Sequence, residues 1–126
     1  MSLVVPAELA EQASSGEVTD EQFVACVRDS LPYAWSVISG LAGRLGASGF
    51  ADNTVPPPDE TARGQLLRAM ASDAMRGALE RHFGVRLAFQ NCHRAAVFRP
   101  GAEDAYREFI TARSQILNQR PELVDC

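Results

Sequence analysis

Hydrophobic and polar residues recur with helical spacing over the longest regular stretch of the chain, from Asp59 to Phe83. The stretch follows the prolines at 56–58, and the Asp59 carboxylate can accept hydrogen bonds from the free N–H groups of a first turn. At 3.6 residues per turn, one face of the helix collects Leu67, Met70, Ala71, Ala74, Ala78 and His82. The opposite face collects Gln65, Ser72, Asp73, Arg76 and Glu80. The pattern predicts one continuous amphipathic helix that stops at Gly84, a residue suited to a left-handed C-terminal cap.

Shorter helices are predicted on both sides of this stretch. Thr19 followed three residues later by Gln22 matches a capping box, so a helix is expected to begin there with Phe23, Cys26 and Val27 buried. The remaining helices are expected at Pro6 to Ala13, Pro32 to Leu45 and Ala102 to Asn118.

The helix from Pro32 to Leu45 is apolar on more than one side, and we expect it to be the most enclosed. Ser30 can cap its first turn. Gly40 and Gly43 each cost about 1 kcal/mol relative to Ala in a helix interior. We expect another helix to approach closely on the Gly40 side as compensation.

After Gly84 the apolar positions recur at every second residue, which is typical of a strand. A second apolar group, at 95–98, follows a polar stretch, so a β-hairpin that turns near 91–92 is predicted. In that hairpin one face would hold Val85, Leu87, Ala96 and Phe98. A short helix over 89–98 is the alternative.

These elements predict a mainly α fold, a single-domain bundle of about four to five helices with a short β-hairpin at 85–98. One domain is expected to span 1–126, with poorly ordered tails at 1–5 and 121–126. At 126 residues the chain can bury one core without a metal or disulfide.

Composition narrows the function classes. The chain is 46% hydrophobic and 22% charged with a net charge of −4, which argues against broad binding to nucleic acid or to an anionic membrane. All 12 basic residues are Arg, so chemistry that needs a Schiff-base or P-loop lysine is excluded. The sequence lacks a membrane-spanning run and a signal peptide, and its three cysteines have no close spacing. We expect a cytoplasmic protein.

The most chemically suggestive segment is the polar turn of the hairpin. Cys92 and His93 are the candidates for catalysis, because a thiol near cationic groups and an imidazole can supply a nucleophile and a base. Adjacent residues on a strand point to opposite faces, so the two need not meet. The sequence from 82 to 100 contains Arg but no Asp or Glu. It could therefore bind a small anionic ligand through Arg86, Asn91, Cys92, His93, Arg94 and Arg99. The alternative is that these arginines pair with acids of neighbouring helices.

Metal and cofactor sites have little support in the sequence. Cys26, His82, Cys92 and His93 could furnish four zinc ligands, but their spacing is not that of a zinc site. No cofactor-binding motif is present, and we predict neither a metal nor a cofactor.

The leading functional hypothesis is a non-enzymatic protein-interaction or regulatory module that self-associates as a homodimer. The alternative is a small-molecule binding protein or an enzyme with a site at the hairpin. DNA binding by a helix-turn-helix has weaker support, because no predicted helix carries a concentrated basic face.

Overall fold

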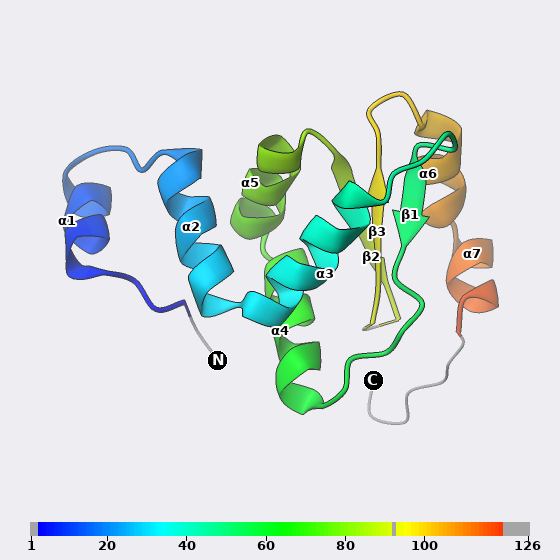
Figure 1. Ribbon diagram of the computed structural model, residues 1–126, viewed down its shortest axis with the longest axis horizontal. Coiled ribbons are helices and arrows are strands. Elements are labelled where there is room, and N and C mark those ends of the chain that lie inside the picture. Colours follow the sequence, from blue (N-terminus) through cyan, green and yellow to red (C-terminus); the bar gives the residue numbers. More distant parts are fainter. Residues whose placement is uncertain (1–2, 92, 120–126) are drawn as a thin grey trace.

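The computed structural model describes residues 3–91 and 93–119, which form one mainly helical domain with a small sheet (Figure 1). In chain order the elements are α1 (Ala7–Ser15), α2 (Asp20–Ser30), α3 (Pro32–Gly43), β1 (Phe50–Asp52), α4 (Glu60–Ala71), α5 (Asp73–Phe83), β2 (Arg86–Gln90), β3 (Arg94–Phe98), α6 (Glu103–Phe109) and α7 (Ala112–Leu117). The predicted class, mainly α with a short hairpin, is confirmed. The tail predicted at 121–126 lies outside the described residues.

The long helix predicted from Asp59 to Phe83 is broken at Ser72, so that prediction is wrong. Ser72 has extended backbone angles (φ −87°, ψ 118°), and its hydroxyl accepts a hydrogen bond of 3.2 Å from the N–H of Met75. Ser72 therefore caps a new helix, α5. The predicted caps at the outer ends are confirmed: Asp59 accepts from the N–H of Ala62, and Gly84 is left-handed (φ 64°).

The break also changes which residues are buried. The buried side chains of α4 and α5 are Ala62, Gln65, Leu66, Ala69, Met70, Met75, Ala78 and Leu79. Leu67, expected to be buried, is 39% exposed, and Gln65, expected to face water, is 8% exposed. Met70 and Ala78 are buried as expected, so the predicted face is wrong only in part. The errors arise because one 3.6-residue periodicity is carried across Ser72, although α4 and α5 are separate helices.

Gln65 is buried because it caps α3. Its side-chain carbonyl accepts hydrogen bonds from the N–H groups of Tyr33 (2.7 Å) and Ala34 (3.2 Å). The expected cap, Ser30, instead accepts a bond of 2.9 Å from the N–H of Val4, which holds the N-terminal segment. A cap supplied by a residue far along the chain has no local sequence signal.

The start of α2 agrees with the prediction, whereas the surroundings of Gly40 on α3 do not. The capping box of Thr19 and Gln22 is confirmed at the start of α2. The close helix approach at Gly40 is wrong, because a Cβ built on Gly40 would meet no atom within 4 Å.

The sheet has the order β1-β3-β2 and is antiparallel throughout. The hairpin of β2 and β3 is confirmed and the alternative helix over 89–98 is wrong, but the expected register is off by one residue. Leu87 pairs with Val97, and Ala88 pairs with Ala96, because the turn spans 91–93. A shift of one residue moves each side chain to the other face. Leu87 therefore shares a face with Val97, while Ala96 and Phe98 lie on the opposite face.

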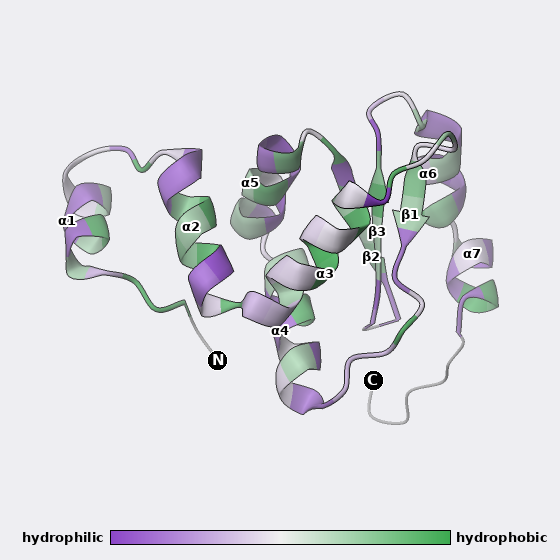
Figure 2. Cartoon of the chain, viewed as in Figure 1, coloured by the Kyte–Doolittle hydropathy of each residue, from purple (hydrophilic) through white to green (hydrophobic). Residues whose placement is uncertain are grey.

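Helices cover both faces of the sheet (Figure 1). One face packs against α3, α4 and α5 and forms the main apolar core, which includes Ile38, Leu66 and Val97. The other face packs against α6 through Ala88, Ala96, Phe98 and Phe109. In Figure 2, green, apolar residues lie along the strands and also along α1, α2 and α5.

The last helix, predicted from Ala102 to Asn118, is divided into α6 and α7. Thr111 is extended (ψ 156°), and its hydroxyl accepts a bond of 3.1 Å from the N–H of Ser114. Like Ser72, Thr111 caps a new helix at a position that contains neither Gly nor Pro.

None of the helices in the described part of the chain combines the length and apolarity needed to cross a lipid bilayer.

Candidate functional site

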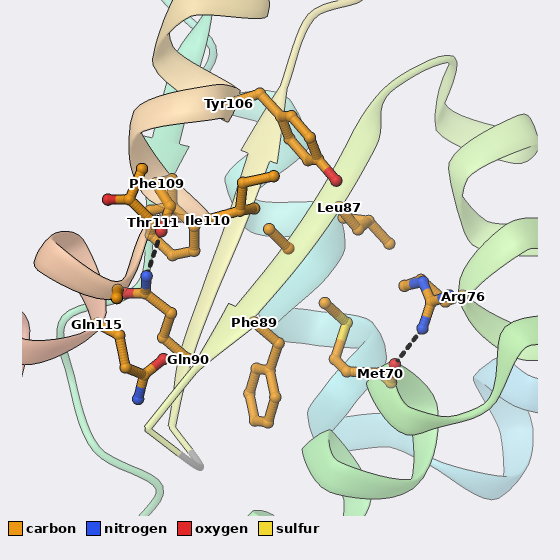
Figure 3. Close-up of a pocket in the computed structure, with 12 residues that line it drawn as sticks. Met70, Arg76, Leu87, Phe89, Gln90, Tyr106, Phe109, Ile110, Thr111 and Gln115 are labelled. Carbon is orange, nitrogen blue, oxygen red and sulfur yellow. Dashed lines mark hydrogen bonds between the residues drawn. The ribbon is translucent and has the colours of Figure 1, made fainter.

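A groove of about 620 Å³ runs along β2 (Figure 3). β2 is an edge strand, because β3 is the only strand within residues 3–91 and 93–119 that pairs with it. In Figure 3 the groove lies between the α4–α5 junction on one side and α6, α7 and their connection on the other. Its lining residues are Met70, Arg76, Leu87, Ala88, Phe89, Gln90, Tyr106, Phe109, Ile110, Thr111, Ala112 and Gln115.

The register of the sheet shows which backbone groups of β2 face the groove. β3 bonds to β1 through alternate residues: the N–H of Asn53 donates to the carbonyl of Ala95, and the N–H of Arg99 donates to that of Gly49. The intervening residues of β3 therefore bond to β2, where their partners are residues 86, 88 and 90. It follows that Leu87 and Phe89 direct their N–H and C=O groups away from β3, toward the free edge.

One of these four groups has a partner within the domain. The N–H of Leu87 donates a hydrogen bond of 2.9 Å to the carboxylate of Glu80, on α5. Among the described residues, the carbonyl of Leu87 and both backbone groups of Phe89 have no hydrogen-bond partner. The free edge is therefore centred on Phe89.

The two walls of the groove differ in character. On the α4–α5 side, Arg76 is held in place, because its Nη1 donates to the carbonyl of Met70 (2.7 Å) and its Nη2 pairs with Asp73 (2.6 Å). On the other side, Ile110 is 55% exposed. Between these walls, the unpaired N–H and C=O groups of an edge strand can pair with another chain.

The arginines predicted to share one site are held separately. Arg86, at the start of β2, pairs with Glu103 of α6 (3.2 Å), and its guanidinium carbon lies 3.7 Å from the centre of the Tyr106 ring. Arg94, at the start of β3, pairs with Asp52 of β1 (3.3 Å). Because β2 and β3 are antiparallel, these two arginines lie at opposite ends of the hairpin.

Arg99 is exposed beyond the end of β3, where its Nη2 donates to the carbonyl of Leu45 (3.3 Å). Arg99 follows Phe98, which is in register with Arg86, so Arg94 alone lies at the other end of the hairpin. Each of the three arginines has its own partner, Glu103, Asp52 or the carbonyl of Leu45. None of the three lines the groove.

The predicted residues of the hairpin turn are placed within the fold. Asn91 has a positive φ of 54°, and its side-chain amide donates to the carbonyls of Gln115 (3.4 Å) and Asn118 (2.7 Å), which attaches α7 to the turn. The side chain of His93 is fully buried, and its Nδ1 lies 2.7 Å from the carbonyl of Asn91. The other catalytic candidate, Cys92, lies outside the described residues.

No metal site is evident in the described residues. Across residues 3–91 and 93–119, no group of three or more His, Cys, Asp or Glu side chains is arranged to hold an ion. Of the four residues considered for zinc, Cys26 is buried on α2, and His82 lies at the end of α5 with its ring 5.6 Å from that of Trp35.

A family comparison covers the whole chain. The family model, which carries KH in its name, matches residues 1–126. The chain belongs to the family described as NucS shadow ORF. That description names a reading frame and states no activity. No curated protein and no solved structure matches the chain.

Sequence reasoning predicted β2 but missed the groove. Its position depends on β1, because pairing with β1 occupies one side of β3 and leaves β2 at the edge. β1 has only three residues, too few for a period-two pattern to be recognised. The groove also depends on the breaks at Ser72 and Thr111, which the continuous helical patterns concealed.

Proposed function

We propose that this protein is a non-enzymatic interaction module that binds an extended segment of a partner protein along the free edge of β2. The observation that carries the proposal is the set of unpaired backbone groups of Leu87 and Phe89, which open into the groove. An added strand can pair with these groups by β-augmentation, in which main-chain hydrogen bonds provide affinity.

The groove has the shape and chemistry for one strand. β2 has five residues, so a paired segment of equal length would span roughly 17 Å. Its side chains would alternate between the two walls, with one set near Met70 and Phe89 and the other near Ile110. We expect uncharged side chains at the centre of the bound segment, because the nearest guanidinium, that of Arg76, already has a carboxylate partner.

Two features favour binding over catalysis and over pairing with a second copy. No lining residue carries a carboxylate, imidazole or thiol, the groups that most often serve as general base or nucleophile. Helices flank the edge strand on both sides, so a second copy that paired through its own β2 would bring its helices against these walls (Figure 3). A single extended segment avoids that clash.

Nucleic-acid binding is the second candidate, and the KH label of the family model is the observation that favours it. KH modules clamp the nucleotide backbone with a Gly-x-x-Gly loop. The α4–α5 junction at the groove reads Ala71-Ser72-Asp73-Ala74, which lacks glycine and adds a carboxylate that would repel phosphate. Gly-x-x-Gly spacing occurs instead at 40–49, around the end of α3. None of those glycines lines the groove, so we favour a peptide as its ligand.

The test is selection from a displayed library of random peptides, followed by fluorescence polarisation with a selected peptide. We expect Phe89→Pro to weaken binding about tenfold or more, because Pro removes the free N–H. The sheet should remain intact, because that N–H does not bond to β3. Phe89→Ala is the matched control: it removes the side chain, keeps the N–H, and should bind more tightly than Phe89→Pro.

Hydrogen exchange supplies a second readout, because a bound strand should protect the amide of Phe89. Equal binding by Phe89→Pro and Phe89→Ala, without protection of that amide, would contradict strand addition. Labelled single-stranded RNA and DNA are tested in parallel, and tighter binding of either would favour the second candidate. Sedimentation of the free protein tests the homodimer, which would replace the peptide proposal if Phe89→Pro dissociated it.

We place the module in the cytoplasm, where reduced thiols such as Cys26 persist.

A further inference from the structure

A second cavity, of about 420 Å³, lies at the opposite end of the molecule from the groove, between the N-terminal segment, α1, α2 and α5. Its lining residues are Leu3, Val5, Leu9, Ala13, Val18, Asp20, Phe23, Cys26, Ala74 and Arg81. We infer that this cavity binds a small aliphatic carboxylic acid, with the chain among the apolar side chains and the carboxylate on Arg81. The inference is independent of the function proposed for β2.

The walls of the cavity suit an aliphatic chain. Eight of its ten lining residues are apolar or thiol-bearing, and they come from the N-terminal segment, α1, α2 with the residues just before it, and α5. Cys26 does not make the cavity polar, because its thiol already donates a hydrogen bond of 3.4 Å to the carbonyl of Val4. A concave apolar site with a few polar groups at one place is the usual form of a small-molecule site.

The polar groups of the cavity form one ion pair. Arg81 donates from Nε (2.5 Å) and Nη2 (2.9 Å) to the carboxylate of Asp20. Among the described residues, Nη1 of Arg81 makes no hydrogen bond. This nitrogen lies 3.2 Å from the position that a Cβ atom would occupy if Gly77 had a side chain. A guanidinium can bind a second carboxylate through its remaining N–H groups. Asp20 would repel that carboxylate, so Arg81 must supply a larger attraction.

α1 provides a cover that can open. None of its residues is buried, and a pair of reciprocal amide hydrogen bonds, of 2.8 and 2.9 Å, joins Gln12 of α1 to Gln22 of α2. An element with few buried contacts opens at low free-energy cost. A ligand can therefore enter without disruption of the main core.

The experiment measures binding of decanoate to the full chain by calorimetry, below its micelle concentration, with 1-decanol as the uncharged comparison. We expect decanoate to bind more tightly than decanol. Arg81→Gln should weaken decanoate about tenfold and leave decanol unchanged, since only the acid uses the guanidinium.

A plug variant tests the location of the site. Ala13→Phe places a ring at the cavity, while Ala10→Phe changes an exposed residue of the same helix that does not line it. Ala74→Phe repeats the plug from α5, so displacement of α1 alone cannot explain the result. We expect both plugs to abolish decanoate binding and Ala10→Phe to preserve it.

Three outcomes would overturn the inference. If decanoate bound both plug variants as tightly as it binds the unsubstituted protein, its site would lie elsewhere. The absence of binding by decanoate and decanol would remove the cavity as a site for aliphatic ligands. Equal binding of the acid and the alcohol would remove the role of Arg81. The Phe89→Pro variant should bind decanoate normally, so failure of either proposal leaves the other testable.

Discussion

The two faces of the sheet are held by different interactions. The face toward α3, α4 and α5 is sealed by large apolar side chains such as Ile38, Leu66 and Leu79, which are at most 1% exposed. The face toward α6 and α7 buries a smaller apolar group and adds a cluster of side-chain amides. Apolar burial is non-directional, whereas amide hydrogen bonds require fixed partners. Because the first face buries the larger apolar cluster, we expect it to account for most of the stability, and the amide bonds of the second to position one wall of the groove.

The largest effect is expected on the first face. Leu66→Ala removes a side chain that is fully buried, and a leucine lost from a core costs about 2–5 kcal/mol. Its neighbour Leu67, which is 39% exposed, is the matched control: Leu67→Ala should change the free energy of unfolding by less than about 1 kcal/mol. Chemical denaturation measures both variants. A cost for Leu67→Ala as large as that for Leu66→Ala would restore the face predicted from a continuous helix.

This pair of leucines also shows how far the sequence predicts the fold. The helices, the hairpin, the capping box at Thr19 and the end at Gly84 follow from local patterns, because each depends on residues close together in the chain. The break at Ser72 does not follow. Serine is tolerated in helix interiors as well as at caps, so its presence alone does not indicate a break.

The candidate site was harder to predict than the fold. The polar residues of the hairpin turn have the chemical types expected of a site, yet Asn91 attaches α7 and His93 is buried. The groove consists mainly of backbone groups and ordinary apolar residues such as Phe89 and Ile110. Its existence depends on strand order and on two helix breaks, which are tertiary features without a local pattern.

A smaller effect is expected on the second face, at Gln90. The amide of this buried residue donates to the carbonyl of Phe109 and to the hydroxyl of Ser114 (3.3 Å), and its carbonyl accepts from Asn118 (3.1 Å). Gln90→Leu keeps a side chain of similar size but removes all three bonds. Ser114 and Asn118 keep the bond between them (3.0 Å), whereas the buried carbonyl of Phe109 loses the amide of Gln90, at a cost of about 1–3 kcal/mol. Hydrogen exchange should show faster opening of α7 than of α4.

Gln119→Leu is the control for this experiment, because Gln119 is exposed at the end of the same amide cluster. It should leave the exchange of α7 close to that of the unsubstituted protein. If backbone amides exchanged faster by the same factor in every element of the Gln90→Leu variant, the two faces would unfold as one unit. That result would contradict the distinction between them.

The smallest effect is expected outside both faces, at the ion pair between Asp20 and Arg81. The hydrogen bond from Arg81 lowers the pKa of Asp20. A carboxyl whose folded pKa is depressed contributes stability above its unfolded pKa of about 4, and that contribution is lost as the pH falls through the folded pKa. As the pH falls below about 4, the melting temperature of the unsubstituted protein should therefore fall further than that of Asp20→Asn. Both side chains are about half exposed, so solvent and salt screen the pair. Added salt should reduce the difference between the two proteins, and a difference that persisted at high salt would indicate that Asp20 acts through something other than this exposed pair.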